Sequence, residues 1–334
     1  MLRDILLLLL GLALLVKGGD SFVAAATRIA GFLRMPRVVI GSTIVSLATT
    51  MPEMVVSIIA GARGNSGLAV GNALGSCVCN IGLILGITAA IRRVDVHPRA
   101  LRTALLTMAG LGVALFVMTL DLALTRWQGV LLLMAGAAYF ACDFIHAARQ
   151  PGPEEVAEAT ATQQVATKGW AWFQTRRGTV AQFSMAAGVV VASSRLVVDG
   201  AVNLAATLGI PPLFIGLTVV AVGTSLPELM TAIGSARRQV SDLSVGNIIG
   251  ANIANLSLVI GAAAVLTPVA MTRLTQLFDF PAMLALMGLL VWTLWTHHRL
   301  TRREGVVLLV SYAAYITVVV VLAALGYQGS AKQN

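Results

Sequence analysis

Two glutamates lie inside apolar stretches of the chain, each directly after a proline. The segment "VSLATTMPEMVV" places Glu53 after Pro52, and "VAVGTSLPELMT" places Glu228 after Pro227. A charged side chain at the centre of a membrane-spanning helix costs about 2.5–3.5 kcal/mol even on the lenient insertion scale, so each carboxylate needs a partner. The apolar segments around them carry arginine only at their ends. We therefore expect the partner to be a cation that is not a protein side chain.

Oxygen-bearing groups recur around both glutamates. Thr49 and Thr224 lie four residues before them, so hydroxyl and carboxylate share a helix face. A proline removes a backbone donor and clashes with the preceding turn, so we expect kinks at both prolines that free carbonyls, including those of Ser46 and Ala221. The next apolar segment of each half adds a stripe at spacing four, which is Asn72, Ser76 and Asn80 in the first and Asn247, Ala251 and Asn255 in the second.

The chemistry of this set favours hard cations. Carboxylates, hydroxyls, amides and loose carbonyls are all oxygen ligands, which suit Ca²⁺, Na⁺, K⁺ or Mg²⁺. Mg²⁺ fits less well because it dehydrates reluctantly and demands octahedral geometry. Cys77, Cys79 and Cys142 lack metal-binding spacing and are interpreted as packing residues. No cofactor is expected.

The charge of the site indicates a mechanism. Two ionised glutamates give it two negative charges, which one Ca²⁺ or two or more Na⁺ neutralise. An empty site would carry both buried charges through the occluded state, at a cost of several kcal/mol per ion. Only occupied forms are then expected to cross, which is the behaviour of an exchanger.

The elements that hold these residues are membrane helices. The chain of 334 residues is 57% hydrophobic and 11% charged, with a mean hydropathy of +0.87, which predicts an integral membrane protein. We expect ten spans of sufficient length, near 2–27, 38–62, 67–91, 101–120, 126–147, 179–208, 213–236, 243–267, 275–298 and 304–325. The first is interpreted as a span and not as a cleaved signal, because the second half contains its counterpart.

The two halves of the chain repeat each other. At an offset of 175 residues, 17 of 46 positions are identical between 41–86 and 216–261. Five helices in each half make the repeats inverted, a plan typical of secondary transporters whose sites lie at the midplane. The predicted organisation is a first repeat (1–147), a cytoplasmic linker (148–178), a second repeat (179–325) and a short tail (326–334).

The positive charges predict the orientation and exclude nucleic acid as the partner. Sixteen of the 23 Lys and Arg residues fall in the odd-numbered loops, and five fall in the even-numbered loops and termini. The positive-inside rule then places the odd loops and the linker in the cytoplasm and both termini outside. Two pairs three and four residues apart, Lys17 with Asp20 and Arg195 with Asp199, are expected to form local ion pairs.

The motifs are recognisable as a family pattern. "GSTIVSLATTMPE" with "GNALGSCVCNIGLILG", and "GLTVVAVGTSLPE" with "GNIIGANIANLSLVIG", resemble the two signature repeats of the Ca²⁺/cation antiporter superfamily, in its prokaryotic sodium/calcium exchanger branch. The resemblance implies an all-α fold of ten helices in two inverted repeats, alternating access and electrogenic exchange of Na⁺ for Ca²⁺ across a prokaryotic inner membrane. It also implies the ligands: Glu53, Glu228, Thr49 and Thr224 for calcium; Ser46, Thr50, Ser76, Ala221 and Ser225 for sodium together with those residues; and Asn80 and Asn255 lining the cavity. Asn72 and Asn247, which belong to the same stripes, are expected to lie behind these ligands.

The chain departs from this pattern in its second half. Ala251 stands where the counterpart of Ser76 often supplies a hydroxyl, so one sodium ligand is missing. Asn255 occupies a position that is Asp in many relatives, including potassium-dependent ones, so the resemblance argues against K⁺ co-transport. The two halves are therefore expected to bind sodium unequally.

Two alternatives remain at this point. A Ca²⁺/H⁺ antiporter could use the same glutamates as proton carriers, although the hydroxyl-rich flanks favour Na⁺. A cation channel would need a ring of ligands around a continuous pore, which an inverted repeat with paired motifs in one chain disfavours. No nucleophile and base pair suggests an enzyme.

Overall fold

The computed structural model describes the chain except for residues 33–42, 44, 96–97, 150–170, 238–240 and 326–334. The elements of the first half are α1 (Leu2–Phe32), α3 (Ser46–Thr49), α4 (Met51–Ala62), α5 (Ser66–Cys79), the π-helix η2 (Asn80–Leu85), α6 (Gly86–Ile91), the strand β1 (Val94–Asp95), α7 (Pro98–Met118), β2 (Ala123–Leu124) and α8 (Arg126–Arg149). Those of the second half are the 3₁₀ turn η3 (Ala171–Gln174), α10 (Arg176–Leu208), α11 (Pro212–Ile215), the π-helix η4 (Gly216–Val220), α12 (Ala221–Thr224), α13 (Leu226–Arg237), α14 (Ser241–Ala254), the π-helix η5 (Asn255–Val259), α15 (Ile260–Leu266), β3 (Val269–Ala270), the π-helix η6 (Thr275–Asp279), α16 (Phe280–His297), β4 (Arg299–Leu300) and α17 (Arg302–Ala324).

Most of the expected spans are present as membrane-length helices. The described part of the chain contains 8 helices that are long and apolar enough to cross a membrane, and up to 9 spans if the bent pair Pro212–Thr224 and Leu226–Ile233 is one. The expected span 38–62 begins outside the described residues, and α4 is the larger part of it that the structure describes.

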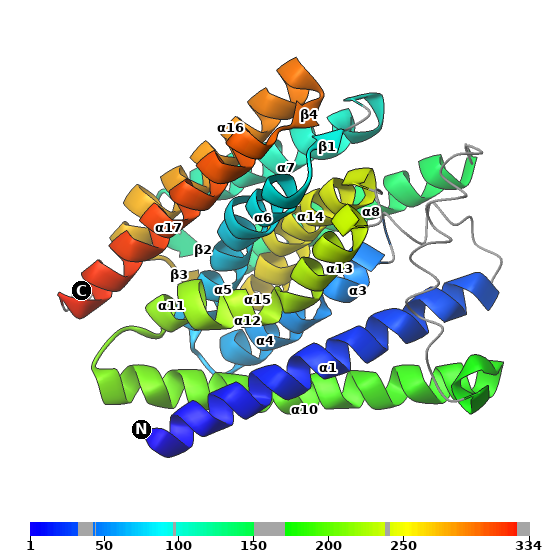
Figure 1. Ribbon diagram of the computed structural model, residues 1–334. Helices are drawn as coiled ribbons and strands as arrows, with labels where there is room; N and C mark the ends of the chain where they lie inside the picture. The colour runs from blue at the N-terminus through cyan, green and yellow to red at the C-terminus, as the bar shows by residue number, and fades with distance from the viewer. Residues whose placement is uncertain (33–42, 44, 96–97, 150–170, 238–240, 326–334) are drawn as a thin grey trace.

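The helices form a central group flanked on two sides. Figure 1 shows α1 and α10 running side by side along one face, with α16 and α17 on the opposite face and α4, α5 and α13 to α15 between them. Burial agrees with this arrangement: within the apolar 18-residue stretch of each span, 78% of the residues are buried in Ser66–Ile91 and 83% in Ser244–Leu266, against 22% in Arg302–Ala324. The polar stripes predicted from the sequence therefore lie on the two innermost spans.

The offset of 175 residues recurs in the backbone. The π-helical turn that begins at Asn80 has its counterpart at Asn255, and strand β1 has its counterpart in β3. The break at Thr50, between α3 and α4, likewise matches the break at Ser225, between α12 and α13. Each break lies two residues before a proline, and the chain bends by 42° across Ser225.

Small residues let the two repeats touch backbone to backbone. A Cβ atom on Gly75 would lie 2.8 Å from the Cα and carbonyl oxygen of Leu217, and one on Gly216 would lie 2.9 Å from the carbonyl oxygen of Leu68. Such distances are too short for any larger side chain, so glycine is required where α5 crosses η4. This contact holds the central spans of the two halves together.

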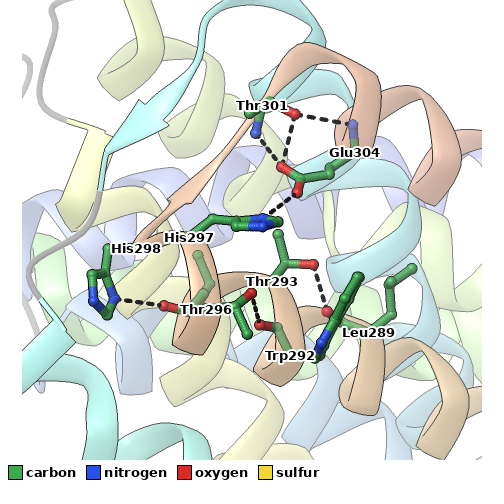
Figure 2. Close-up of polar contacts among 9 residues, drawn as sticks. Leu289, Trp292, Thr293, Thr296, His297, His298, Thr301 and Glu304 are labelled. Carbon is green, nitrogen blue, oxygen red and sulfur yellow. Dashed lines mark hydrogen bonds and ion pairs between the residues drawn. The ribbon is translucent and has the colours of Figure 1, made fainter.

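Two short ribbons close the ends of the bundle. β1 pairs with β4 and β2 pairs with β3, both antiparallel, so each ribbon joins the two repeats. Figure 2 shows the start of α17 beside the first ribbon, where Thr301 and Glu304 form a capping box and Glu304 also contacts His297. His297 and His298 therefore end α16 at the bundle surface.

The ion pairs predicted on α1 and α10 are wrong. Asp199 pairs with Arg63, which follows α4, and not with Arg195 on its own helix. Among the described residues no ion pair joins Lys17 to Asp20. The reason on α10 is that a cation four residues before an anion is the weaker orientation on a helix, so a partner from another element competes successfully.

Candidate functional site

The two predicted glutamates lie at matching places in the bundle. Glu53 is in the first turn of α4 and Glu228 in the first turn of α13, and both are fully buried. Each helix starts afresh after the break that precedes its proline, so its unpaired N–H groups and positive dipole end lie next to the carboxylate. The broken helices thus reduce the cost of two buried negative charges without adding a cationic side chain.

The carboxylates have few partners within the described part of the chain. The Ser225 hydroxyl donates to Oε1 of Glu53 at 2.9 Å. Oε2 of Glu53 and both carboxylate oxygens of Glu228 are buried and accept no hydrogen bond. None of the described ion pairs involves either glutamate. The site therefore offers three unsatisfied carboxylate oxygens.

Hydrogen bonds cross from one repeat to the other around Glu53. The Thr224 hydroxyl donates to Oδ1 of Asn72 at 3.1 Å. The amide nitrogen of Asn72 donates to the hydroxyl of Ser57 at 2.9 Å and to the backbone carbonyl of Glu53 at 3.1 Å. Together with the Ser225 bond, these contacts fix α12 and the start of α13 against α4 and α5.

The hydroxyls of the first repeat turn back onto their own helix. Thr49 and Thr50 donate to the carbonyl of Ser46 at 3.1 and 2.8 Å. The Ser46 hydroxyl in turn donates to the backbone carbonyl of Asn247 at 3.4 Å. Thr50 and its counterpart Ser225 therefore do different things: one contacts a carbonyl of its own helix, and the other contacts the carboxylate of the opposite repeat.

The inner stripes supply further unsatisfied oxygen atoms. The amide nitrogen of Asn80 donates to Oδ1 of Asn252 at 3.0 Å, which leaves Oδ1 of Asn80 buried without a partner. The same holds for other buried atoms of the predicted set, namely Oγ of Ser76, Oδ1 of Asn247, and both polar side-chain atoms of Asn255. Ala251 is buried beside them and adds no ligand.

The donor set suits a hard cation. The described residues contain no group of three or more His, Cys, Asp or Glu side chains that could hold a metal ion. A cation held here would rely on two carboxylates, completed by hydroxyl, amide and carbonyl oxygens, and such mixed oxygen shells are typical of calcium and sodium. Buried oxygen atoms without a hydrogen bond are costly unless something else satisfies them, and a bound cation does so.

Sequence reasoning missed several buried polar residues. Ser57 lies one turn after Glu53, and its spacing of four was a usable signal. Asn252 lies three residues before Asn255 in "GANIAN" and makes the contact that orients Asn80. Asp279 was not predicted at all; it is buried at the end of η6, away from the signature segments, where it accepts a hydrogen bond from Tyr315 at 3.0 Å.

The sequence matches a known family over most of its length. Residues 4–142 and 178–321 match the family described as sodium/calcium exchanger protein. The inner membrane protein YrbG of Escherichia coli is 37% identical over 298 residues, which are 87% of this chain and 90% of YrbG. The sodium/calcium exchanger MaX1 of Methanosarcina acetivorans is 30% identical over 94% of this chain and 98% of its own.

The fold also matches solved structures. The sodium-calcium exchanger NCX_Mj, soaked with 2.5 mM Na⁺ and 0.1 mM Ca²⁺, superimposes with a TM-score of 0.66 at 28% identity, covering 95% of this chain and 98% of the other. The same exchanger soaked without Na⁺ and Ca²⁺ gives a TM-score of 0.64. The inverted two-repeat architecture inferred from the sequence is therefore confirmed.

Proposed function

The chain belongs to the sodium/calcium exchanger family, and from this premise we propose that it exchanges Na⁺ for Ca²⁺ across a prokaryotic inner membrane by alternating access. In this proposal Glu53, Glu228, Thr49 and Thr224 hold calcium. Sodium uses the same carboxylates with the hydroxyls of Thr50, Ser76 and Ser225 and the carbonyls of Ser46 and Ala221, with Asn80 and Asn255 lining the cavity.

One observation supports this proposal most directly: two fully buried carboxylates share the centre of the bundle with no cationic side chain paired to them in the described part of the chain. Three of their four oxygens accept no hydrogen bond. Two such charges match one divalent ion or several monovalent ions, and their burial requires that something neutralise them.

Exchange follows from the same electrostatics. A site that carries two unneutralised charges cannot pass through a water-free occluded state at low cost, because each buried ion loses several kcal/mol of hydration. A calcium-loaded or sodium-loaded site passes at lower cost. Net flux of calcium in one direction therefore needs a counter-ion in the other.

Sodium is proposed as that counter-ion because of the neutral oxygens. Protons need only the carboxylates, whereas the buried hydroxyl of Ser76 and the amide oxygens of Asn80, Asn247 and Asn255 are oriented without hydrogen-bond partners. These groups are suitable ligands for a monovalent metal ion. Asn255 stands where potassium-dependent relatives carry Asp, which favours a K⁺-independent cycle, and the family resemblance implies that this cycle is electrogenic.

The experiment is calcium uptake into vesicles that contain the purified full chain. We expect ⁴⁵Ca²⁺ to accumulate with an outward Na⁺ gradient, and the rate to respond to membrane potential. Uptake that follows a pH gradient and ignores Na⁺ would replace sodium with protons as the coupling ion. Fast uptake without any counter-gradient would indicate a channel.

Neutral variants test the residues. Glu53→Gln and Glu228→Gln should each abolish exchange in a folded, extractable protein. Asp279→Asn is the matched control, since it neutralises a buried carboxylate of the same bundle outside the proposed site and should retain exchange. Retained exchange in both glutamine variants would rule out the proposed ligands.

A further inference from the structure

A chain of three side chains links α4, α5 and α12. The Ser57 hydroxyl donates to the backbone carbonyl of Ala69 at 3.3 Å and accepts from the Asn72 amide at 2.9 Å. The same amide nitrogen also donates to the backbone carbonyl of Glu53 at 3.1 Å, so its donors are turned away from Thr224. Its oxygen consequently points to Thr224 and accepts that hydroxyl at 3.1 Å. Ser57, Asn72 and Thr224 are all fully buried.

The chain of hydrogen bonds from Ser57 through Asn72 to Thr224, called the relay below, is missing at the pseudo-symmetric positions. The counterpart of Ser57, at the offset of 175 residues, is Ala232, which has no hydroxyl. The counterpart of Asn72 is Asn247, whose Oδ1 accepts no hydrogen bond. The counterpart of Thr224 is Thr49, which contacts the carbonyl of Ser46 at 3.1 Å as Thr224 contacts that of Ala221 at 3.3 Å, but among the described residues Thr49 lacks the further bond to an amide of the other repeat. Ser244 does carry a hydroxyl on α14, but that hydroxyl has no hydrogen-bond partner either.

The two threonines both donate and keep their lone pairs, but they differ in the groups that accept their hydrogen. A hydroxyl has one donor hydrogen and two acceptor lone pairs, so a threonine that donates to a fixed amide oxygen keeps its lone pairs for a cation. The relay fixes the direction of the Asn72 amide through two donors, and so holds the amide oxygen closer to the Thr224 hydroxyl (3.1 Å) than the competing carbonyl of Ala221 (3.3 Å). Thr49 uses a carbonyl that also accepts from Thr50, and that carbonyl is itself a candidate sodium ligand.

We propose that Ser57 and Asn72 are positioning residues that hold the Thr224 hydroxyl ready for the transported cation, and that the Thr49 hydroxyl, which bonds to a carbonyl of its own helix, has no such support from the other repeat. This inference rests on the proposed function. Neither Ser57 nor the Asn72 amide touches the cation in this scheme; they act through Thr224. A preorganised ligand lowers the ordering cost of binding, so loss of the relay weakens cation binding.

The test uses Ser57→Ala, which gives the first half the side chain that the second half carries at 232. The purified full chain is reconstituted, and the Ca²⁺ dependence of Na⁺-driven ⁴⁵Ca²⁺ uptake is measured. We expect the half-saturating Ca²⁺ concentration to rise about five- to tenfold, the effect of one neutral hydrogen bond, with the maximal rate nearly unchanged. Ser244→Ala is the matched control and should leave both quantities unchanged, because the hydroxyl that it removes makes no hydrogen bond.

A double-mutant cycle shows whether the effect passes through the amide. Asn72→Ala should raise the half-saturating concentration at least as much, and Ser57→Ala should add nothing in that background, since the relay is already broken. Independent, additive effects of the two changes would overturn the relay. A melting temperature measured with and without CaCl₂ gives a second readout, in which Ser57→Ala reduces the Ca²⁺-induced rise.

Two outcomes separate the inference from the function on which it rests. If wild-type protein exchanges Na⁺ for Ca²⁺ and Ser57→Ala lowers the melting temperature equally with and without CaCl₂ at an unchanged half-saturating concentration, Ser57 is structural only and the inference fails alone. If wild-type protein neither takes up Ca²⁺ nor melts higher with it, the proposed function and the inference fail together.

Discussion

Neutralising Glu228 should make the ion-free protein more stable while it destroys the response to calcium. Both oxygens of this buried carboxylate lack a hydrogen-bond partner in the described structure, so its charge is offset mainly by the dipole end of α13 and the nearby Thr49 hydroxyl. A charge at helix centre costs about 2.5–3.5 kcal/mol, and glutamine removes most of that cost, so an upper value for the gain is about 2–3 kcal/mol. Glu53→Gln should stabilise the ion-free protein by about 1 kcal/mol less than Glu228→Gln, because the charge of Glu53 strengthens the hydrogen bond from Ser225.

The assay is thermal unfolding of the purified full chain in detergent, with N-methylglucamine as the only cation. In the presence of a calcium chelator we expect Glu228→Gln to melt highest, Glu53→Gln next and wild type lowest. Calcium at a hundred times its dissociation constant stabilises a one-site protein by about 2.7 kcal/mol. In calcium, the melting temperature of wild type should therefore rise to that of the variants or above it, while the melting temperatures of the variants stay unchanged.

The control again is Asp279→Asn. It removes a buried charge outside the proposed site, so it should raise the melting temperature in both conditions by the same amount. Lower stability of Glu228→Gln than of wild type in chelator would mean that the ion-free protein already neutralises this carboxylate. A calcium-induced rise in Glu228→Gln equal to that of wild type would remove Glu228 from the ligand set.

Three further variants test separate parts of the structure. Asn252→Ala leaves the Asn80 amide without its acceptor, so the half-saturating Ca²⁺ concentration in uptake should rise about five- to tenfold. Its control is Cys77→Ala, at the pseudo-symmetric position. This variant should change the half-saturating concentration less than about twofold, because no described bond joins Cys77 to a candidate ligand. Gly75→Ala should destabilise the protein by about 1–3 kcal/mol in thermal unfolding, since its Cβ would lie 2.8 Å from backbone atoms of the other repeat, whereas Gly110→Ala, with nothing within 4 Å, should be neutral or slightly stabilising. Arg63→Gln should change the free energy of unfolding by less than about 1 kcal/mol, because the ion pair with Asp199 that it breaks is exposed.

The gross architecture could be predicted because it depends on quantities that a single sequence carries. The hydropathy of the sequence identifies the membrane-spanning segments, and the identical residues at an offset of 175 identify the duplication. The burial of Glu53 and Glu228 also follows from their places in apolar stretches. The breaks at Thr50 and Ser225 follow from the prolines two residues later, whose geometry acts within one turn.

The π-helical turns could not be predicted in the same way. η2 and η5 begin at Asn80 and Asn255, yet no residue type specifies a shift from the α to the π hydrogen-bond pattern. The shift rotates the helix and therefore changes which residues after it share a face with those before it. A spacing rule for a regular helix cannot carry across such a turn, so the packing of both repeats must be known first.

Contacts between repeats were also beyond sequence reasoning. Spacing within one helix placed Thr224 and Ser225 near Glu228, their neighbour in the chain. In the structure their hydroxyls serve Asn72 and Glu53 of the other repeat. An inverted repeat brings the two motifs face to face, so the nearest acceptor of a hydroxyl is on the opposite helix as often as on its own.

The site is asymmetric because the exchange mechanism requires the two repeats to share a backbone path but does not require them to share side chains. Alternating access by inverted repeats requires equivalent backbone paths, and the breaks at Thr50 and Ser225, the π-helical turns at Asn80 and Asn255, and the strands β1 and β3 recur at the same offset. The bound ions place no such demand on the side chains, because a calcium ion needs a sufficient number of oxygens and not a symmetric set. Hydroxyls and amides can therefore differ between the halves, as Ser57 differs from Ala232 and Cys77 from Asn252, while both carboxylates remain. A half that is held rigid and a half that is free to adjust can then accept ions of different size at one centre, which a strictly symmetric site would do less well.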